Sequence, residues 1–90
     1  MPRAIVDPAD LRRFAGGLKH FNTELAHQLS VLQGQFGALG DTWRDQEHEK
    51  FAEEFEQTVR VLSHFAASAA EHVPFLLRKA ERIEEYLHQR

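Results

Sequence analysis

Histidine and glutamate side chains are the residues of this sequence best suited to metal binding. His20, Glu24 and His27 follow one another at steps of four and three, so they share one face of a helix. Glu-x-x-His is the spacing of di-iron helical bundles, in which glutamates on facing helices complete the site. The facing segment 58–62 contains no glutamate, and both histidines fall on the outer side. We therefore predict that these side chains form solvated surface, with no metal site and no bound cofactor. The alternative is a metal-binding bundle, which stoichiometric iron or zinc in the purified protein would support.

The residues that act as nucleophiles in enzymes lack the partners that activate them. The sequence has no cysteine, so no thiolate is available. Ser30, Ser63 and Ser68 lie in segments of helical pattern without an adjacent base and orienting group. Phosphate-binding loops, nucleophile elbows and HExxH zinc motifs are absent from the sequence. These features predict a protein that is not an enzyme.

Length and charge restrict the class of protein further. Ninety residues predict a single domain, 1–90, with a modest core. The formal net charge is −3, and the two signs are interspersed, which argues against binding nucleic acid or an anionic membrane. No apolar run approaches the roughly 18 residues of a membrane span, and the N-terminus has no apolar core of a cleavable signal peptide. We expect a protein that is either cytoplasmic or secreted without a cleaved signal peptide.

The apolar residues up to position 39 recur at steps of three and four. Asp7 and Pro8 have the types favoured at the cap and first position of a helix, and Gly40 favours its end. The pattern predicts one amphipathic helix over about 8–39, with this seam: Leu11, Phe14, Leu18, Phe21, Leu25, Leu29, Leu32, Phe36 and Leu39.

A second seam of the same kind predicts a helix over about 45–88, after a turn at 40–44. The Glu47-His48-Glu49 segment is interpreted as a solvated helix start. Pro74 removes one helical hydrogen bond, so we expect a kink or a break near Ala70 to Pro74. The seam of this helix is Phe51, Phe55, Thr58, Leu62, Phe65, Ala69, Val73, Leu76, Ala80, Ile83 and Leu87.

Two long helices joined by a short turn predict an all-α antiparallel hairpin. Counting outward from the turn places Phe36 opposite Phe51. The apolar stripe on each helix is too wide for one hairpin to cover, so we expect a dimer that forms a four-helix bundle, with a monomer as the alternative. Val59, Ala66 and Val73 lie beside the seam at seven-residue spacing and are the predicted dimer face. The partner is either a second copy or a sister hairpin.

The C-terminal segment continues the apolar pattern beyond the expected length of the first helix. The same count pairs Leu11 with about Leu76, so residues 77–90 should overhang. We predict that this tail binds a partner, with Ile83, Tyr86 and Leu87 as its contact residues. The alternative is that the tail packs on the partner hairpin and lengthens the bundle.

The turn holds the only tryptophan, Trp43, with a phenylalanine, Phe51, eight residues later. Two amphipathic helices around a central tryptophan resemble the WXG100 family, small helical hairpins of type VII secretion. In this sequence Asp45 stands where the family motif Trp-x-Gly has glycine, and Arg90 follows Tyr86 where the family's C-terminal signal has an acidic residue. The resemblance implies a substrate or accessory partner of a type VII-like secretion system. The alternative is a cytoplasmic adaptor that binds a partner helix. Trp43 is expected to cover the end of the bundle, and it can also form one wall of a docking cleft.

Overall fold

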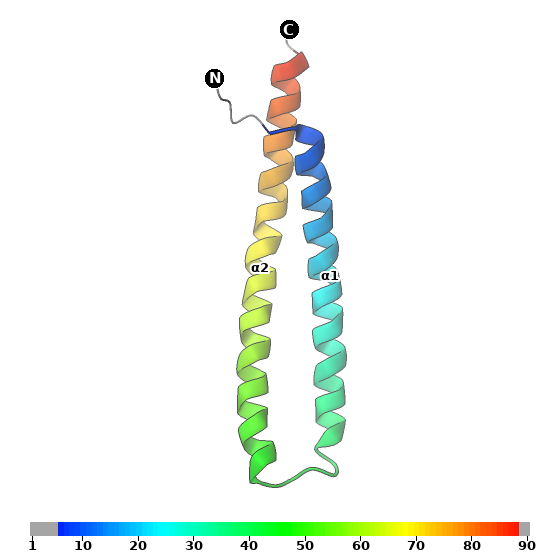
Figure 1. The fold of residues 1–90 in the computed structure, drawn as a ribbon, viewed down its shortest axis with the longest axis vertical. Coiled ribbons are helices and arrows are strands. Elements are labelled where there is room, and N and C mark those ends of the chain that lie inside the picture. The colour runs from blue at the N-terminus through cyan, green and yellow to red at the C-terminus, as the bar shows by residue number, and fades with distance from the viewer. Residues whose placement is uncertain (1–5, 89–90) are drawn as a thin grey trace.

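The computed structural model describes residues 6–88, which form one antiparallel helical hairpin (Figure 1). Helix α1 spans Pro8–Leu39 and helix α2 spans Gln46–His88, and these bounds lie within one residue of the ranges expected from the sequence. The molecule is a rod, 69 Å along its longest axis and 22 by 15 Å across. No strand occurs in the part of the chain that the structure describes. The all-α hairpin predicted from the sequence is confirmed.

Local hydrogen bonds fix the start of α1. The carboxylate of Asp7 accepts a hydrogen bond from the backbone N–H of Ala9 at 2.9 Å, and Pro8 occupies the first helical position. The N–H of Leu11 donates to the Asp7 carbonyl at 3.1 Å, which closes the first turn. The first residue of the helix is therefore set by its capping residue and proline.

Helix α2 continues through Pro74 to His88. The break expected as one outcome near this proline is therefore not present, and Figure 1 shows only a gentle bend along α2. A proline leaves one carbonyl of its own helix without a donor, but the turns on both sides keep their hydrogen bonds. Packing of α2 along α1 supports those turns, so a single missing bond does not interrupt the helix.

The two helices pack differently at their two ends. Toward the termini they draw together (Figure 1), and there Ala15 and Ala80 are almost completely buried, with 1% and 0% of their surface exposed. Alanine has no side chain beyond Cβ, so two helices can approach closely over such residues. Toward the turn, the rings of Phe36, Phe51 and Phe55 fill a wider space. The contact of Phe36 with Phe51, with ring centres 5.6 Å apart, agrees with the pairing expected from the sequence.

An ion pair near the termini joins the tail of α2 to the start of α1. The guanidinium of Arg12 donates two hydrogen bonds to the carboxylate of Glu84, at 2.7 and 3.0 Å. Helix α1 therefore reaches α2 far beyond Leu76, and the prediction that residues 77–90 overhang is wrong in extent. Counting from the turn assumed a constant separation of the two helices and ignored the reach of a long arginine side chain. Among the described residues, only those after Glu84 extend past this contact.

Candidate functional site

The turn that carries Trp43 is held by backbone hydrogen bonds to the end of α1. The N–H groups of Thr42 and Trp43 both donate to the carbonyl of Leu39, at 3.1 and 3.0 Å. The guanidinium Nε of Arg44 donates to the carbonyl of Gly40 at 3.1 Å. These bonds satisfy carbonyls that the end of a helix leaves without intrahelical donors. The position of Trp43 is thus set by the backbone on both sides of it.

Asp45, the residue in place of the motif glycine, caps the start of α2. Its Oδ1 accepts a hydrogen bond from the backbone N–H of His48 at 3.0 Å. This is the geometry of an N-cap, in which a side-chain oxygen satisfies a donor at the third helical position. Glycine and aspartate are both favoured at such a position, glycine for its backbone freedom and aspartate for its acceptor. The substitution therefore keeps the helix start intact.

Five rings gather where the turn meets the two helices, and we call this set the aromatic cluster. Phe36 lies at its centre. The ring of His48 stacks on Phe36 with centres 5.1 Å apart, and Phe55 lies at 5.1 Å from Phe36 on another side. Trp43 meets His48 edge-on at 5.0 Å and lies 6.0 Å from Phe51. Offset and edge-on ring contacts of this kind each add about 0.5–1.5 kcal/mol beyond area burial.

His48 is the member of the cluster that sequence reasoning missed. The Glu47-His48-Glu49 segment was expected to be solvated, yet the His48 side chain is half-buried between Phe36 and Trp43. Its Nε2 is buried without a hydrogen-bond partner among the described residues. The sequence did hold one indication that His48 is buried. His48 lies three residues before Phe51, which places both rings on one helix face.

Trp43 itself is half-buried over the end of the hairpin. Beside it, Phe36 and Phe51 line a shallow groove of about 360 Å³ together with Phe55, Leu32 and Leu39. The structure thus brings the sequence-predicted residues Trp43, Asp45 and Phe51 together at one end of the molecule. Their part in partner binding stays a prediction.

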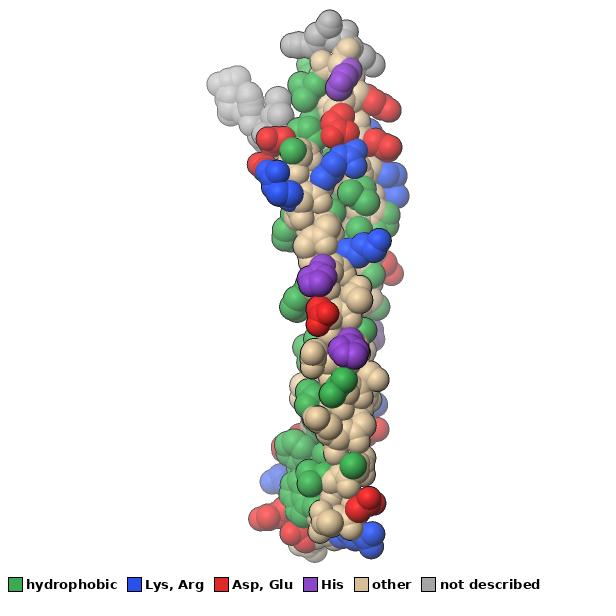
Figure 2. Space-filling model, turned by 90° about the vertical axis from the view of Figure 1, so that its right-hand side faces the viewer, with side chains coloured by type: hydrophobic (Ala, Val, Ile, Leu, Met, Phe, Trp, Pro, Cys, Tyr) green, Lys and Arg blue, Asp and Glu red, His purple; other side chains and the backbone are tan. Residues whose placement is uncertain are grey.

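The histidines and glutamates considered for a metal site lie apart from this end. His20, Glu24 and His27 are all exposed. Figure 2 shows histidine side chains on the outer surface of the rod, near charged side chains of both signs. Over residues 6–88 no group of three or more metal-ligating side chains comes together.

The predicted dimer-face residues Val59, Ala66 and Val73 are half-buried and lie on one of the two wide faces of the hairpin. We call it the polar-edged face, because α1 contributes mainly polar residues to it. Asn22 donates from Nδ2 to the carbonyl of Ala66 at 3.3 Å, which ties the two helices together there. The α1 residues of this face are Lys19, Asn22, Thr23, Gln33 and Gly37.

The opposite wide face carries most of the exposed large apolar side chains. Phe14 is 62% exposed and Val61 is 56% exposed. Both helices contribute to this face, α1 at steps of seven and eleven residues and α2 at steps of four and ten, which return to one side of a helix. The apolar surface therefore runs along the rod, and Figure 2 shows hydrophobic side chains following one edge of the molecule, most densely near the turn. We call this surface the apolar stripe; its residues are Phe14, Phe21, Leu32, Leu39, Phe51, Val61, Phe65 and Phe75.

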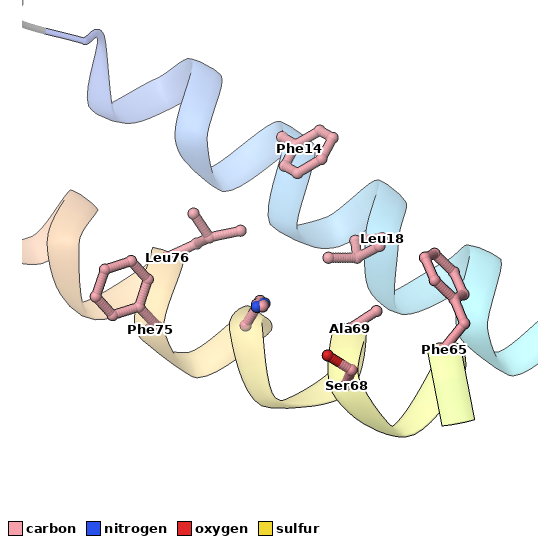
Figure 3. Close-up of a pocket in the computed structure, with 8 residues that line it drawn as sticks. Phe14, Leu18, Phe65, Ser68, Ala69, Phe75 and Leu76 are labelled. Carbon is pink, nitrogen blue, oxygen red and sulfur yellow. The ribbon is translucent and has the colours of Figure 1, made fainter. Parts of the chain in front are cut away.

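A groove of about 460 Å³ opens in the apolar stripe toward the termini (Figure 3). Its floor is Leu18, Ala69 and Leu76, which are buried or half-buried. Phe14 and Phe75 are exposed beside this floor, one from each helix. Among the described residues, the polar side chains that line the groove are Ser68 and His72. Such a surface can bind apolar side chains of a partner and offers little for catalysis.

The tail residues proposed to contact a partner differ in exposure. Ile83 is half-buried, whereas Tyr86 and Leu87 are 65% and 48% exposed. The Arg12–Glu84 ion pair holds the tail against α1: the hydrogen bond from Arg12 lowers the pKa of Glu84, and the same bond raises the pKa of Arg12. The last turn of α2 is therefore the only described part of the tail beyond the reach of α1.

A long helical hairpin with a tryptophan turn and one exposed apolar face defines a class of small helical interaction proteins. The chain matches the family model for WXG100, proteins of 100 residues with WXG, over residues 4–86. It belongs to the WXG100 family, the helical hairpins associated with type VII secretion.

Solved structures of one secreted protein have the same fold. The wild-type EsxB of Bacillus anthracis str. Sterne is 25% identical, with a TM-score of 0.79 over 94% of this chain and 99% of that chain. Its P67A mutant is 26% identical, with a TM-score of 0.80 over 94% and 96% of the two chains. Comparison with curated protein sequences found no match. Neither helix of the described region is long and apolar enough to cross a membrane.

Proposed function

We propose that the protein is a substrate, or an accessory partner of a substrate, of a type VII-like secretion system. The observation that carries the proposal is the WXG100 match over residues 4–86, which includes the tryptophan turn. EsxB, a secreted protein of the same fold, supports export as the common property of such hairpins. On this proposal the protein leaves the cell without a cleaved signal peptide and performs no catalysis.

The two ends of the rod have separate roles in this proposal. At one end, a partner or the secretion machinery docks at Trp43 and at the shallow groove beside it, which Phe51 lines. At the other end, Tyr86 and Leu87 present apolar surface from the last turns of α2, and a helix of this kind binds by inserting such side chains into a groove of its partner. Ile83 anchors the tail to the hairpin.

The working form of the protein is a pair of hairpins. Members of the family typically dimerise with a sister hairpin. Within residues 6–88, a single hairpin buries only Ala15, Leu29, Ala69 and Ala80 well and exposes a dozen large apolar side chains. A second hairpin, identical or related, removes that surface from water and supplies the missing core.

Export is tested by comparing culture medium and cell lysate in cells that encode the protein. The protein should appear in the medium of wild-type cells and disappear from it when the membrane-anchored ATPase of the secretion system is deleted. Trp43→Ala and Tyr86→Ala should each reduce the exported fraction, while Glu71→Ala, an exposed substitution elsewhere on α2, should not. Retention of the wild-type protein in the lysate, with the ATPase active, would instead favour a cytoplasmic adaptor.

A further inference from the structure

The tail of α2 is joined to the start of α1 through both oxygens of one carboxylate. The Nε of Arg12 donates a hydrogen bond to Oε2 of Glu84 at 3.0 Å, and its Nη2 donates to Oε1 at 2.7 Å. Two parallel bonds fix the direction of the contact as well as its length. Over residues 6–88 this is the one ion pair between the helices, since the other pair, Arg13 with Asp10, lies within α1.

The ion pair lies where the two helices pack most closely. Ala15 follows Arg12 by three residues and Ala80 precedes Glu84 by four, and both alanines are almost completely buried. Residues three or four apart share one side of a helix. The Arg12–Glu84 pair therefore lies on the side where α1 and α2 meet, and close packing below it holds the two side chains at bonding distance.

A second hydrogen bond joins the last turn of α2 to the same glutamate. The ring Nδ1 of His88 lies 3.0 Å from the backbone carbonyl oxygen of Glu84. A carbonyl oxygen can only accept, so Nδ1 carries the hydrogen and donates it. Histidine in the last turn of a helix commonly bonds a carbonyl in this way and suits the helix dipole.

Glu84 is thus bonded to α1 through its side chain and to the helix end through its backbone. We call Arg12, Glu84 and His88 the tail clamp. Tyr86 and Leu87, which are 65% and 48% exposed, lie between Glu84 and His88. Figure 1 shows the last turns of α2 rising past the start of α1. The end of a chain is usually poorly ordered unless it is tied down, and here the ties lie on both sides of the exposed pair.

We infer that the tail clamp holds Tyr86 and Leu87 as a preformed helical turn, so that α1 positions the partner-binding end of α2. This inference rests on the proposed binding of a partner by the tail. It adds the form in which the tail is presented, a helix before binding, and the residues that impose this form. Arg12 and His88 are positioning residues, which act through Glu84 and through the last turn.

A preformed turn binds more tightly than a frayed one. A segment that is already helical does not lose backbone freedom when the partner binds it. When only a fraction of the molecules have an ordered tail, the apparent affinity falls by that fraction. The clamp is a graded device, because 44% and 37% of its two charged side chains are exposed and water weakens their attraction.

The clamp is tested by amide hydrogen exchange, followed by NMR on the full chain. Arg12→Ala should speed the exchange of amides 85–88 about threefold, the size expected for an exposed ion pair with two good bonds. Amides in the middle of both helices should keep their rates. The substitution lies in α1, so it leaves the intrinsic exchange rates of the tail unchanged. Arg13→Ala is the matched control, because Arg13 pairs with Asp10 of its own helix, and it should leave amides 85–88 unaffected.

Reversal of the two charges separates positioning from a direct contact of Arg12 with a partner. Arg12→Glu alone should speed the exchange of the tail more than Arg12→Ala, because two carboxylates then face each other. Adding Glu84→Arg should restore most of the lost protection. In the export assay the exported fraction should follow the same order, with Arg12→Ala lowered about threefold and Arg13→Ala unchanged.

Three results would overturn the inference. Unchanged exchange at amides 85–88 in Arg12→Ala would show that the ion pair does not order the tail. Equal acceleration along the whole of both helices would make Arg12 a residue of general stability. Faster exchange of the tail with an unchanged exported fraction would show that the partner does not need a preformed helix. Wild type that stays in the lysate would reject the proposed export, whereas the exchange rates would still decide whether the clamp orders the tail.

Discussion

Replacing Asp45 by alanine tests whether the residue at the motif glycine position acts as a helix cap. The substitution removes the side-chain acceptor of the 3.0 Å hydrogen bond from the His48 N–H, which then keeps only its 3.1 Å bond to the backbone carbonyl of residue 45. Loss of an aspartate N-cap costs about 1 kcal/mol, within a range of about 0.5–2 kcal/mol, whereas glycine at the same position costs a few tenths. For a domain of this size, about 1 kcal/mol lowers Tm by about 4–8 °C.

The assay is thermal unfolding followed by helical circular dichroism, at one fixed protein concentration because Tm of an associating protein depends on it. Asp45→Ala should unfold several degrees below wild type, and Asp45→Gly, which restores the family motif, should lie close to wild type. Asp41→Ala removes the same charge from the same turn and should have little effect, since among the described residues the Asp41 carboxylate accepts no hydrogen bond of the kind that Asp45 accepts from His48. Equal Tm values for Asp45→Ala and Asp45→Gly would refute the capping role, and equal losses for Asp45→Ala and Asp41→Ala would assign the effect to charge.

Three further predictions concern the helices and their contacts. Pro74→Ala should raise the free energy of unfolding in urea by up to about 3 kcal/mol, because the new backbone N–H can donate a hydrogen bond to the carbonyl of Ala70. A destabilised variant would show that the proline supports the bend of α2. Glu84→Gln should be less stable than wild type at neutral pH, because it loses the ion pair with Arg12. This ion pair lowers the pKa of Glu84, so the stability that it contributes is lost when the carboxylate is protonated. The difference between variant and wild type should therefore vanish as pH falls through the lowered pKa of Glu84. A difference independent of pH would exclude the ion pair with Arg12 as its source. Phe36→Ala should lower the free energy of unfolding by about 2 kcal/mol, less than the ~3–5 kcal/mol lost when a fully buried phenylalanine is replaced by alanine. Phe36→Leu should recover part of this loss. An unchanged urea midpoint for Phe36→Ala would show that the aromatic cluster contributes no stability.

The limits of the helices followed from local chemistry and were therefore visible in the sequence. Asp7 and Pro8 set the first turn of α1 through a side-chain acceptor and a fixed φ, which are properties of single residues. The pairing of Phe36 with Phe51 also follows directly, because both lie within a few residues of the turn. Close to a turn, counting along two helices accumulates little error.

Features that depend on the distance between the two helices could not be predicted from the sequence pattern. Periodicity gives the apolar face of each helix but not how closely two faces approach, so the contact of Arg12 with Glu84 was not predicted. The burial of His48 depends on the ring of Phe36, which reaches it from the other helix. Periodicity likewise does not determine which side of a wide apolar arc stays exposed, because that depends on how α2 is rotated against α1. The choice of Val59, Ala66 and Val73 as the dimer face therefore stays a prediction.

The most direct test of the proposed function is the amount of protein in the culture medium, relative to lysate, with and without the ATPase of the secretion system. The measurement uses wild type and Trp43→Ala in parallel, with a cytoplasmic protein as the control for lysis. The proposal predicts that wild type reaches the medium only when the ATPase is present and that Trp43→Ala, folded by circular dichroism, reaches it several-fold less. Equal amounts of wild type in the medium with and without the ATPase would contradict secretion by this route.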